Sequence, residues 1–166
     1  MGFKDWCTPP DFFKALDKQF HFTLDVAASH YNHLLPAYCT KDGLFYQFGS
    51  ILEVDGLAYP WGNERVFCNP PYDHNLSKWV AKALKREAEV AVLLLPPSVD
   101  AEWFHKALAP GDKIDGSTLF AGGTIWNGWT GPDLGVYFMR GRLHFWRDGK
   151  PSKAPRAGNM LVIVYG

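Results

Sequence analysis

Apolar residues recur along the chain in two patterns, one helical and one typical of covered strands. A helical spacing begins at Pro9-Pro10-Asp11 and brings Phe13 and Phe20 to one face, and proline fits the first turn of a helix. A second helical pattern occupies residues 75–88, and Asp100 is an expected N-cap for a third helix through Leu108. Continuous apolar runs predict strands that are covered on both faces, at residues 22–24, 66–68 and 90–95.

The second half of the chain changes to shorter strand patterns separated by turns. Strands are expected at about residues 113–120, 135–140, 142–147 and 160–165, whereas residues 30–64 are expected to be irregular. Helices that alternate with covered strands, followed by turn-linked strands, predict an α/β fold. The expected architecture is one domain over residues 1–166, with a mostly parallel central sheet and an antiparallel edge hairpin.

Composition supports a folded domain. The chain has 166 residues, of which 47% are hydrophobic and 16% aromatic, enough to build a core and too many for a disordered chain. The apolar run at residues 90–95 is too short to span a bilayer, and we expect neither a membrane span nor a secretory signal. Cys7, Cys39 and Cys68 are odd in number and lack metal-type spacing, which favours a reducing cytoplasm and no metal site.

Charge is unevenly distributed, although the formal net charge is zero. Residues 140–156 contain six Lys and Arg and one Asp, so this stretch has a charge of 6 − 1 = +5 and the remainder has −5. Phe145 and Trp146 interrupt the basic run. Basic residues interleaved with aromatic ones suit a groove that follows phosphates, and an ordinary solvated hairpin is the alternative.

Asn69-Pro70-Pro71-Tyr72 is the most informative motif. It lies between a strand pattern and a helix pattern, and each proline restricts both itself and the residue before it. The Asn69 side-chain oxygen and the Pro70 carbonyl would be two fixed acceptors for an exocyclic amino group, and Tyr72 would offer a stacking face. A plain Asn-Pro-Pro turn is the structural alternative.

Two acidic residues fall where ligands bind in α/β sheets. Asp25 follows the strand at residues 22–24, and a further strand-like element is expected to end near Asp55-Gly56-Leu57. Because ligands bind outside the carboxyl ends of parallel strands, Asp25, Asp55 and Asn69 are expected at one crevice. Either aspartate can instead be a turn residue.

In combination, these motifs resemble the small phage-type DNA N6-adenine methyltransferases of the Dam group, amino-methyltransferases that use S-adenosylmethionine. The similarity extends over nearly the full length and depends on matching segments in order: Trp6-Cys7-Thr8-Pro9, residues 22–28, Asp55-Gly56-Leu57 with Trp61, Asn69-Pro70-Pro71-Tyr72 with Trp79, residues 94–96 with Asp100, Trp103 and Phe104, and residues 141–145. Larger enzymes of this class have a Gly-rich loop after the first strand, whereas this chain has Asp25-Val26-Ala27-Ala28-Ser29.

The resemblance implies a three-layer, Rossmann-like methyltransferase fold, with DNA and S-adenosylmethionine as partners, in the cytoplasm of the host if the chain is phage-encoded. Asn69, Pro70, Pro71 and Tyr72 would then be catalytic, and Thr8, Pro9, Asp25, Asp55 and Asn69 would contact the cofactor. Arg140 and Arg142 are candidates for phosphate contacts, and a salt bridge within a hairpin is the alternative for Arg142.

Three other functions remain open from the sequence: methylation of cytosine N4, methylation of a protein glutamine, and nucleic-acid binding without catalysis. The chain is too short for a separate target-recognition domain, so base readout is expected from residues 30–64 and 120–135.

Overall fold

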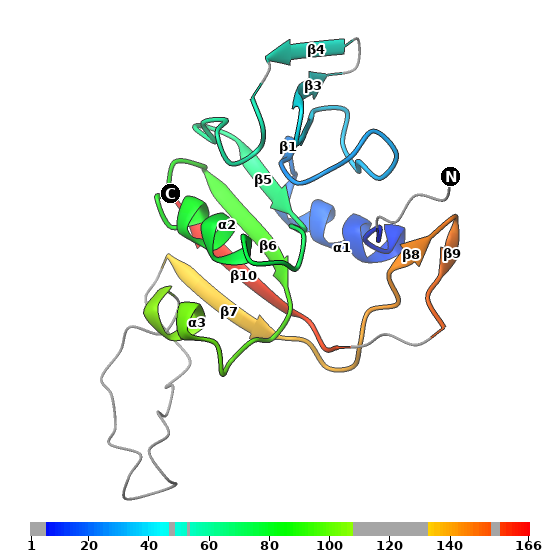
Figure 1. The fold of residues 1–166 in the computed structure, drawn as a ribbon, viewed down its shortest axis with the longest axis vertical. Coiled ribbons are helices and arrows are strands. Elements are labelled where there is room, and N and C mark those ends of the chain that lie inside the picture. The colour runs from blue at the N-terminus through cyan, green and yellow to red at the C-terminus, as the bar shows by residue number, and fades with distance from the viewer. Residues whose placement is uncertain (1–5, 47–48, 53, 108–132, 154–156) are drawn as a thin grey trace, which may run out of the picture.

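The computed structural model describes residues 6–46, 49–52, 54–107, 133–153 and 157–166. These residues form one eight-stranded sheet in the order β4-β3-β2-β1-β5-β6-β10-β7, together with three helices and a separate two-stranded ribbon, β8-β9 (Figure 1). The α/β class expected from the sequence is confirmed.

The centre of the sheet is parallel. It consists of four neighbouring strands, β2 (Tyr38–Thr40), β1 (Leu24–Asp25), β5 (Arg65–Cys68) and β6 (Val90–Leu95). In register, Asp25 lies beside Phe67 of β5, and Cys68 lies beside Leu93 of β6. The carboxyl ends of β1, β5 and β6 therefore meet at one edge of the sheet.

Antiparallel strands flank this centre on both sides. They are β3 (Gly43–Tyr46) and β4 (Gly49–Leu52) beyond β2, and β10 (Met160–Tyr165) and β7 (Leu134–Phe138) beyond β6. Among the described strands of this sheet, three neighbouring pairs are parallel and four are antiparallel, so the sheet is mixed and the expectation of a mostly parallel sheet was wrong. The expected antiparallel edge is present.

The segment at residues 30–64 was expected to be irregular and instead contains β2, β3 and β4. These strands are three or four residues long, and so short a stretch shows too few alternations to be distinguished from a loop. Strand pairing, rather than local pattern, defines them.

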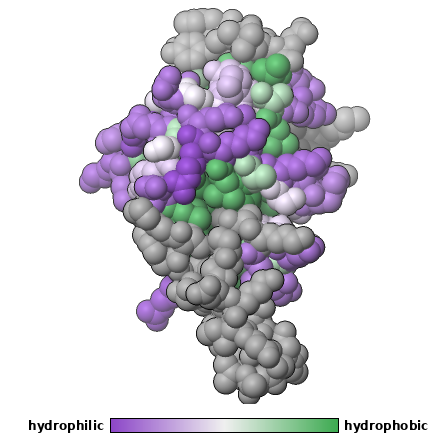
Figure 2. Space-filling model, turned by 90° about the vertical axis from the view of Figure 1, so that its left-hand side faces the viewer, coloured by the Kyte–Doolittle hydropathy of each residue, from purple (hydrophilic) through white to green (hydrophobic). Residues whose placement is uncertain are grey.

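Helices cover both faces of the sheet. Phe13 and Phe20 of α1 (Pro10–Phe20) share an apolar cluster with Val90 and Val92 of β6. Residues that alternate with these along β6 belong to a second cluster, which includes residues of α2 (Leu76–Ala83) and α3 (Glu102–Ala107). This alternation explains why β6 is apolar throughout its length. On the face that is on the left-hand side of Figure 1, the described surface is mostly hydrophilic, with apolar side chains near its middle and towards its upper end (Figure 2).

Aromatic packing attaches α1 to the sheet. Phe13 lies edge-on to Phe67 of β5 with ring centroids 5.1 Å apart, and it stacks on Phe22 at 5.7 Å. Each such pair contributes about 0.5–1.5 kcal/mol beyond the area that it buries. The contacts fix α1, and therefore the residues that precede it, relative to β1 and β5.

Two helices differ from their predicted limits. α2 ends at Ala83 rather than at residue 88, because Arg86 turns the chain with φ of 58° toward β6. α3 begins at Glu102, and the Ala101 carbonyl accepts the first helical hydrogen bonds, so Asp100 is not its N-cap. The predicted end of α3 at Leu108 and the predicted strand at 113–120 lie outside the described residues.

The predicted strand at residues 142–147 is also shorter than expected. Only Trp146–Arg147 forms β8, which pairs with β9 (Lys150–Pro151) apart from the main sheet. Asp148 and Gly149 both have positive φ, 51° and 73°, as a two-residue type I′ hairpin turn requires.

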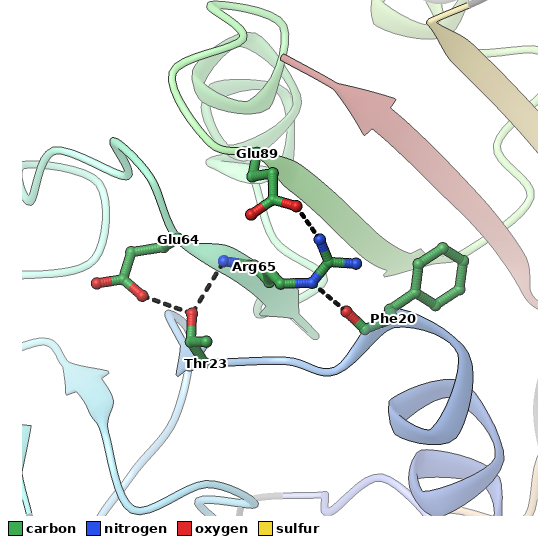
Figure 3. A network of polar contacts seen from close by, with 5 residues as sticks. All are labelled: Phe20, Thr23, Glu64, Arg65 and Glu89. Carbon is green, nitrogen blue, oxygen red and sulfur yellow. Dashed lines mark hydrogen bonds and ion pairs between the residues drawn. The ribbon is translucent and has the colours of Figure 1, made fainter.

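A polar network holds the amino ends of β1, β5 and β6, at the edge opposite the carboxyl ends (Figure 3). The Arg65 guanidinium donates to the Phe20 carbonyl and pairs with Glu89, while the Arg65 backbone N–H donates to the Thr23 hydroxyl at 2.9 Å. The Thr23 hydroxyl in turn donates to Glu64. One arginine therefore links the end of α1 to three strands.

The turn at Gly56 approaches the loop after β1 very closely. A Cβ at Gly56 would lie 1.9 Å from the Val26 carbonyl oxygen, and the buried Trp61 indole donates a 2.8 Å hydrogen bond to the Gly56 carbonyl. Only glycine fits this position, and the contact brings the Asp55 turn against the end of β1.

We expect Gly56→Ala to lower the free energy of unfolding by about 3 kcal/mol, since the methyl group would overlap backbone that cannot move independently. Urea unfolding measures this loss. Gly62→Ala is the matched control, because its added methyl group would meet nothing closer than 4.0 Å. Equal losses in the two variants would contradict the close approach.

Candidate active site

The candidate site lies at the carboxyl ends of β1 and β5, as the sequence predicted. Asp25 is the last residue of β1, and Asn69 directly follows β5. The parallel register places Asp25 beside Phe67, two residues before Asn69. The tetrapeptide Asn69-Pro70-Pro71-Tyr72 therefore leaves the sheet next to the residues that follow β1.

A hydrogen bond from the N-terminal segment orients Asn69. Its Nδ2 donates to the hydroxyl of Thr8, which is 3% exposed, over 3.0 Å. The amide oxygen then faces away from Thr8. Within the described part of the chain, neither this oxygen nor the Pro70 carbonyl accepts a hydrogen bond, so two acceptors are available at a turn stiffened by two prolines.

Tyr72 presents its ring and anchors its hydroxyl. The residue is 46% exposed, yet its hydroxyl donates to the Leu94 carbonyl at 3.3 Å and accepts from Asn159 Nδ2 at 3.4 Å. Burial of the hydroxyl raises the pKa of Tyr72 well above its ordinary value, so it stays protonated at neutral pH. Phe145 meets the ring edge-on, with centroids 6.4 Å apart and an interplanar angle of 90°.

The segment at residues 6–8 connects the tetrapeptide to the β8-β9 ribbon, which belongs to the basic stretch at residues 140–156 and is called the basic ribbon below. Cys7 and Trp146 exchange two backbone hydrogen bonds of 2.8 Å, while the next residue, Thr8, binds Asn69. On the other side of Cys7, the Trp6 ring lies 5.5 Å from the Arg147 guanidinium. The sequence motif identified Thr8 and Pro9 as candidate site residues. The pairing of the preceding Cys7 with Trp146 of β8 could not be predicted, because nothing in the local sequence indicates it.

Asp25 is a buried carboxylic acid. It is 3% exposed, and one of its oxygens accepts the Leu34 N–H at 3.1 Å, which folds residues 26–34 over the strand end. Burial raises the pKa of Asp25 to about 7. Hydrogen bonds from the Leu34 and Ala27 backbone lower this pKa, but by less than burial raises it. A strongly desolvated acid at a strand end suits a cationic ligand.

Asp55 lies nearby but does not end a strand of the sheet, contrary to expectation. It is exposed in a turn after β4, and its Oδ1 accepts the N–H groups of Leu57 at 2.9 Å and Ala58 at 2.8 Å. Burial, followed by the charges of Asp25, Asp55 and Glu64, raises the pKa of Cys39 to about 12.

Arg140 and Arg142 are exposed in the segment between β7 and β8. The residue that follows them, Leu143, donates its N–H to Asn159 Oδ1 at 3.4 Å. The same Asn159 side chain contacts Tyr72. Asn159 therefore connects the tetrapeptide to the segment that contains Arg140 and Arg142, called the arginine segment below. Asn159 was missed by sequence reasoning, because a single Asn before a strand is an ordinary turn signal.

Three residues with metal-ligating side chains that lie close in sequence, His30, His33 and Cys39, have other contacts in the structure. His33 stacks on Tyr38 with centroids 4.0 Å apart, His30 hydrogen-bonds the Tyr38 hydroxyl, and Cys39 is fully buried. Across the part of the chain that the structure describes, no three His, Cys, Asp or Glu residues gather as a metal site. In the same part, every helix is too short or too polar to cross a bilayer.

Comparison with known proteins identifies one family. A family model described as DNA N-6-adenine-methyltransferase (Dam) matches residues 3–165, which is nearly the whole chain. A search of curated proteins found no match.

Burial of Asp25 predicts a specific pH dependence of stability. With its pKa near 7 in the folded state and near 3.8 when unfolded, folding binds a proton between these values, and stability falls as pH rises through them. Between pH 5 and pH 7 we expect the wild type to lose roughly 2 kcal/mol of unfolding free energy relative to Asp25→Asn. Urea unfolding at both pH values measures this difference, and parallel pH profiles for the two proteins would refute it.

Proposed function

Because the chain belongs to the DNA N-6-adenine-methyltransferase (Dam) family, we propose that it transfers a methyl group from S-adenosylmethionine to N6 of adenine in DNA. One observation supports this most directly: Asn69 and Pro70 present two available oxygen acceptors beside the exposed Tyr72 ring, at the carboxyl edge of the sheet. That arrangement suits a planar base with an exocyclic amino group.

The chemistry requires acceptors because the adenine amino lone pair is delocalised into the ring. In our proposal, the Asn69 oxygen and the Pro70 carbonyl each accept one N6 hydrogen bond and draw the nitrogen toward tetrahedral geometry. Pro71 stiffens the turn, and Tyr72 stacks on the extruded base, which offsets the few kcal/mol that flipping costs. Fixed acceptors need no rearrangement during the reaction, which is the source of their catalytic effect.

S-adenosylmethionine supplies an activated methyl group on a sulfonium, so no covalent enzyme intermediate is needed. We propose that Asp25 and Asp55 hold polar or cationic groups of this cofactor, with Thr8, Pro9 and Asn69 beside it. The burial of Asp25 supports this assignment. Burial disfavours the ionised carboxylate, and a cationic group of the cofactor beside it would favour that ionised form again. The bond from Asn69 to Thr8 gives Thr8 a second role, in orienting the catalytic amide.

We further propose that the chain is a single three-layer domain with a Rossmann-like methyltransferase fold. The apolar clusters on both faces of the sheet and the parallel centre support it. Base readout was expected from residues 30–64, but part of that segment forms β2, β3 and β4, so we propose the loop at residues 26–37 instead and add the loop at residues 139–145. Of the predicted readout segment 120–135, residues 120–132 lie outside the described residues.

The alternatives are methylation of cytosine N4 or of a protein glutamine, and DNA binding without catalysis. The family description names adenine N6, and the complete Asn-Pro-Pro-Tyr sequence supports catalysis. We place the reaction in the cytoplasm, inside the host cell if the chain is phage-encoded, with DNA as the partner.

Replacement of Asn69 tests the mechanism. Asn69→Ala should lower turnover about 100-fold or more, because a preorganised hydrogen-bonding group is lost, while cofactor affinity changes far less. Steady-state methylation and calorimetry measure the two quantities. Asn69→Asp keeps an acceptor and should retain more activity than Asn69→Ala. Near-normal methylation by Asn69→Ala would eliminate the proposed role.

Cofactor binding is tested at the two aspartates. Asp25→Ala should weaken S-adenosylmethionine binding by roughly 1.5–3 kcal/mol, the range for a hydrogen bond to a charged group. At position 55, Asp55→Asn is the better variant, because it keeps an oxygen for the Leu57 and Ala58 N–H groups and removes only the charge. Unchanged affinity of both variants in calorimetry would show that the cofactor lies elsewhere.

DNA binding is tested at the exposed arginines. Replacing both Arg140 and Arg142 by Ala should weaken binding to all sequences equally and reduce the slope of log affinity against log salt by roughly one unit per lost contact. Lys85→Ala, at an exposed lysine after α2, is the control. If the salt slope is reduced only in Lys85→Ala, the DNA phosphates bind beside α2 and not at Arg140 and Arg142.

A further inference from the structure

Asn159 contacts three parts of the candidate site at once. It is 3% exposed and lies immediately before β10. Its Nδ2 donates to the Tyr72 hydroxyl at 3.4 Å, its Oδ1 accepts the Leu143 N–H at 3.4 Å, and its backbone carbonyl accepts the Met139 N–H at 3.0 Å. A single buried residue thus links the tetrapeptide to both ends of the segment that contains Arg140 and Arg142.

The Tyr72 hydroxyl is used for anchoring rather than chemistry. Its proton goes to the Leu94 carbonyl at the end of β6, and its oxygen accepts from Asn159. Although its hydroxyl is anchored, the residue as a whole is 46% exposed, and Phe145 approaches the ring at right angles. Two hydrogen bonds at one end and one perpendicular aromatic contact define the plane in which the ring lies.

We infer that Asn159 is a positioning residue, which fixes the plane of the Tyr72 ring and joins it to the arginine segment. This inference rests on the proposed function, in which Tyr72 stacks on the target base. A base stacked on a misdirected ring would present its amino group away from Asn69 and Pro70, and misplacement by about 1 Å costs about 100-fold in rate. Loss of Asn159 should therefore reduce turnover without reducing cofactor affinity.

A double-mutant cycle separates this role from general support of the fold. Its four proteins are the wild type, Asn159→Ala, Tyr72→Phe and the double variant, and single-turnover methylation is measured for each. Asn159→Ala should slow methyl transfer about tenfold or more in the wild type. In the Tyr72→Phe background the same change should cost less than about threefold, because the hydroxyl it acts through is already gone.

The matched control is Thr23→Val, which removes a hydroxyl that accepts the Arg65 N–H at 2.9 Å, at the amino ends of the strands and so at the edge opposite the candidate site. Its methylation rate should stay within about twofold of the wild type, although it too removes a hydrogen bond. If Asn159→Ala does not fold, Asn159→Asp replaces it, since it keeps the size and the acceptor for Leu143. If the rate losses of Asn159→Ala and Tyr72→Phe multiply fully in the double variant, or if Thr23→Val loses as much as Asn159→Ala, the inference is overturned.

Urea unfolding of the same proteins distinguishes failure of this inference from failure of the proposed function. The midpoint shift caused by Asn159→Ala should be smaller in Tyr72→Phe than in the wild type. If this midpoint shift is smaller in Tyr72→Phe but none of the proteins methylates adenine, the proposed function is overturned, and with it the role of Tyr72 in base stacking. If the wild type methylates adenine but Asn159→Ala has the same effect on midpoint and rate in both backgrounds, the positioning role alone is overturned.

Discussion

The parallel pairing of β1 with β5 is the constraint on which the site depends. It brings Asp25 beside Phe67 and leaves Asn69 at the same edge, although Asp25 and Asn69 are 69 − 25 = 44 positions apart in sequence. Parallel neighbours point their carboxyl ends in one direction, so the residues that end or follow these strands lie at one edge of the sheet, where ligands bind in α/β folds. The Arg65 network supports the opposite edge, where it joins α1 to the amino ends of the same strands.

A second constraint comes from the N-terminal segment. Thr8 binds Asn69, while its neighbour Cys7 pairs with Trp146 of the basic ribbon. Asn159 makes a comparable link from the other side, between Tyr72 and Leu143. The candidate catalytic turn is therefore held by segments from both ends of the chain, and the basic residues are positioned by the same contacts.

The sequence predicts the parts of the fold that have strong local patterns. The apolar run of β6 and the periodicity of α1 and α2 identify these elements, and the strand ends place Asp25 and Asn69 correctly. The short strands β2 to β4 could not be predicted, because three or four residues have no period. Asn159, the pairing of Cys7 with Trp146, and the closeness of Gly56 to Val26 depend on long-range contacts that leave no local signal.

The most direct test of the account is the identity of the methylated product. Purified protein is incubated with methyl-labelled S-adenosylmethionine and unmethylated DNA, and the DNA is then digested to nucleosides and separated. We expect label in N6-methyldeoxyadenosine, and far less of it with Asn69→Ala. Label in N4-methyldeoxycytidine, label on protein, or no transfer by a protein that binds the cofactor would contradict the proposed function.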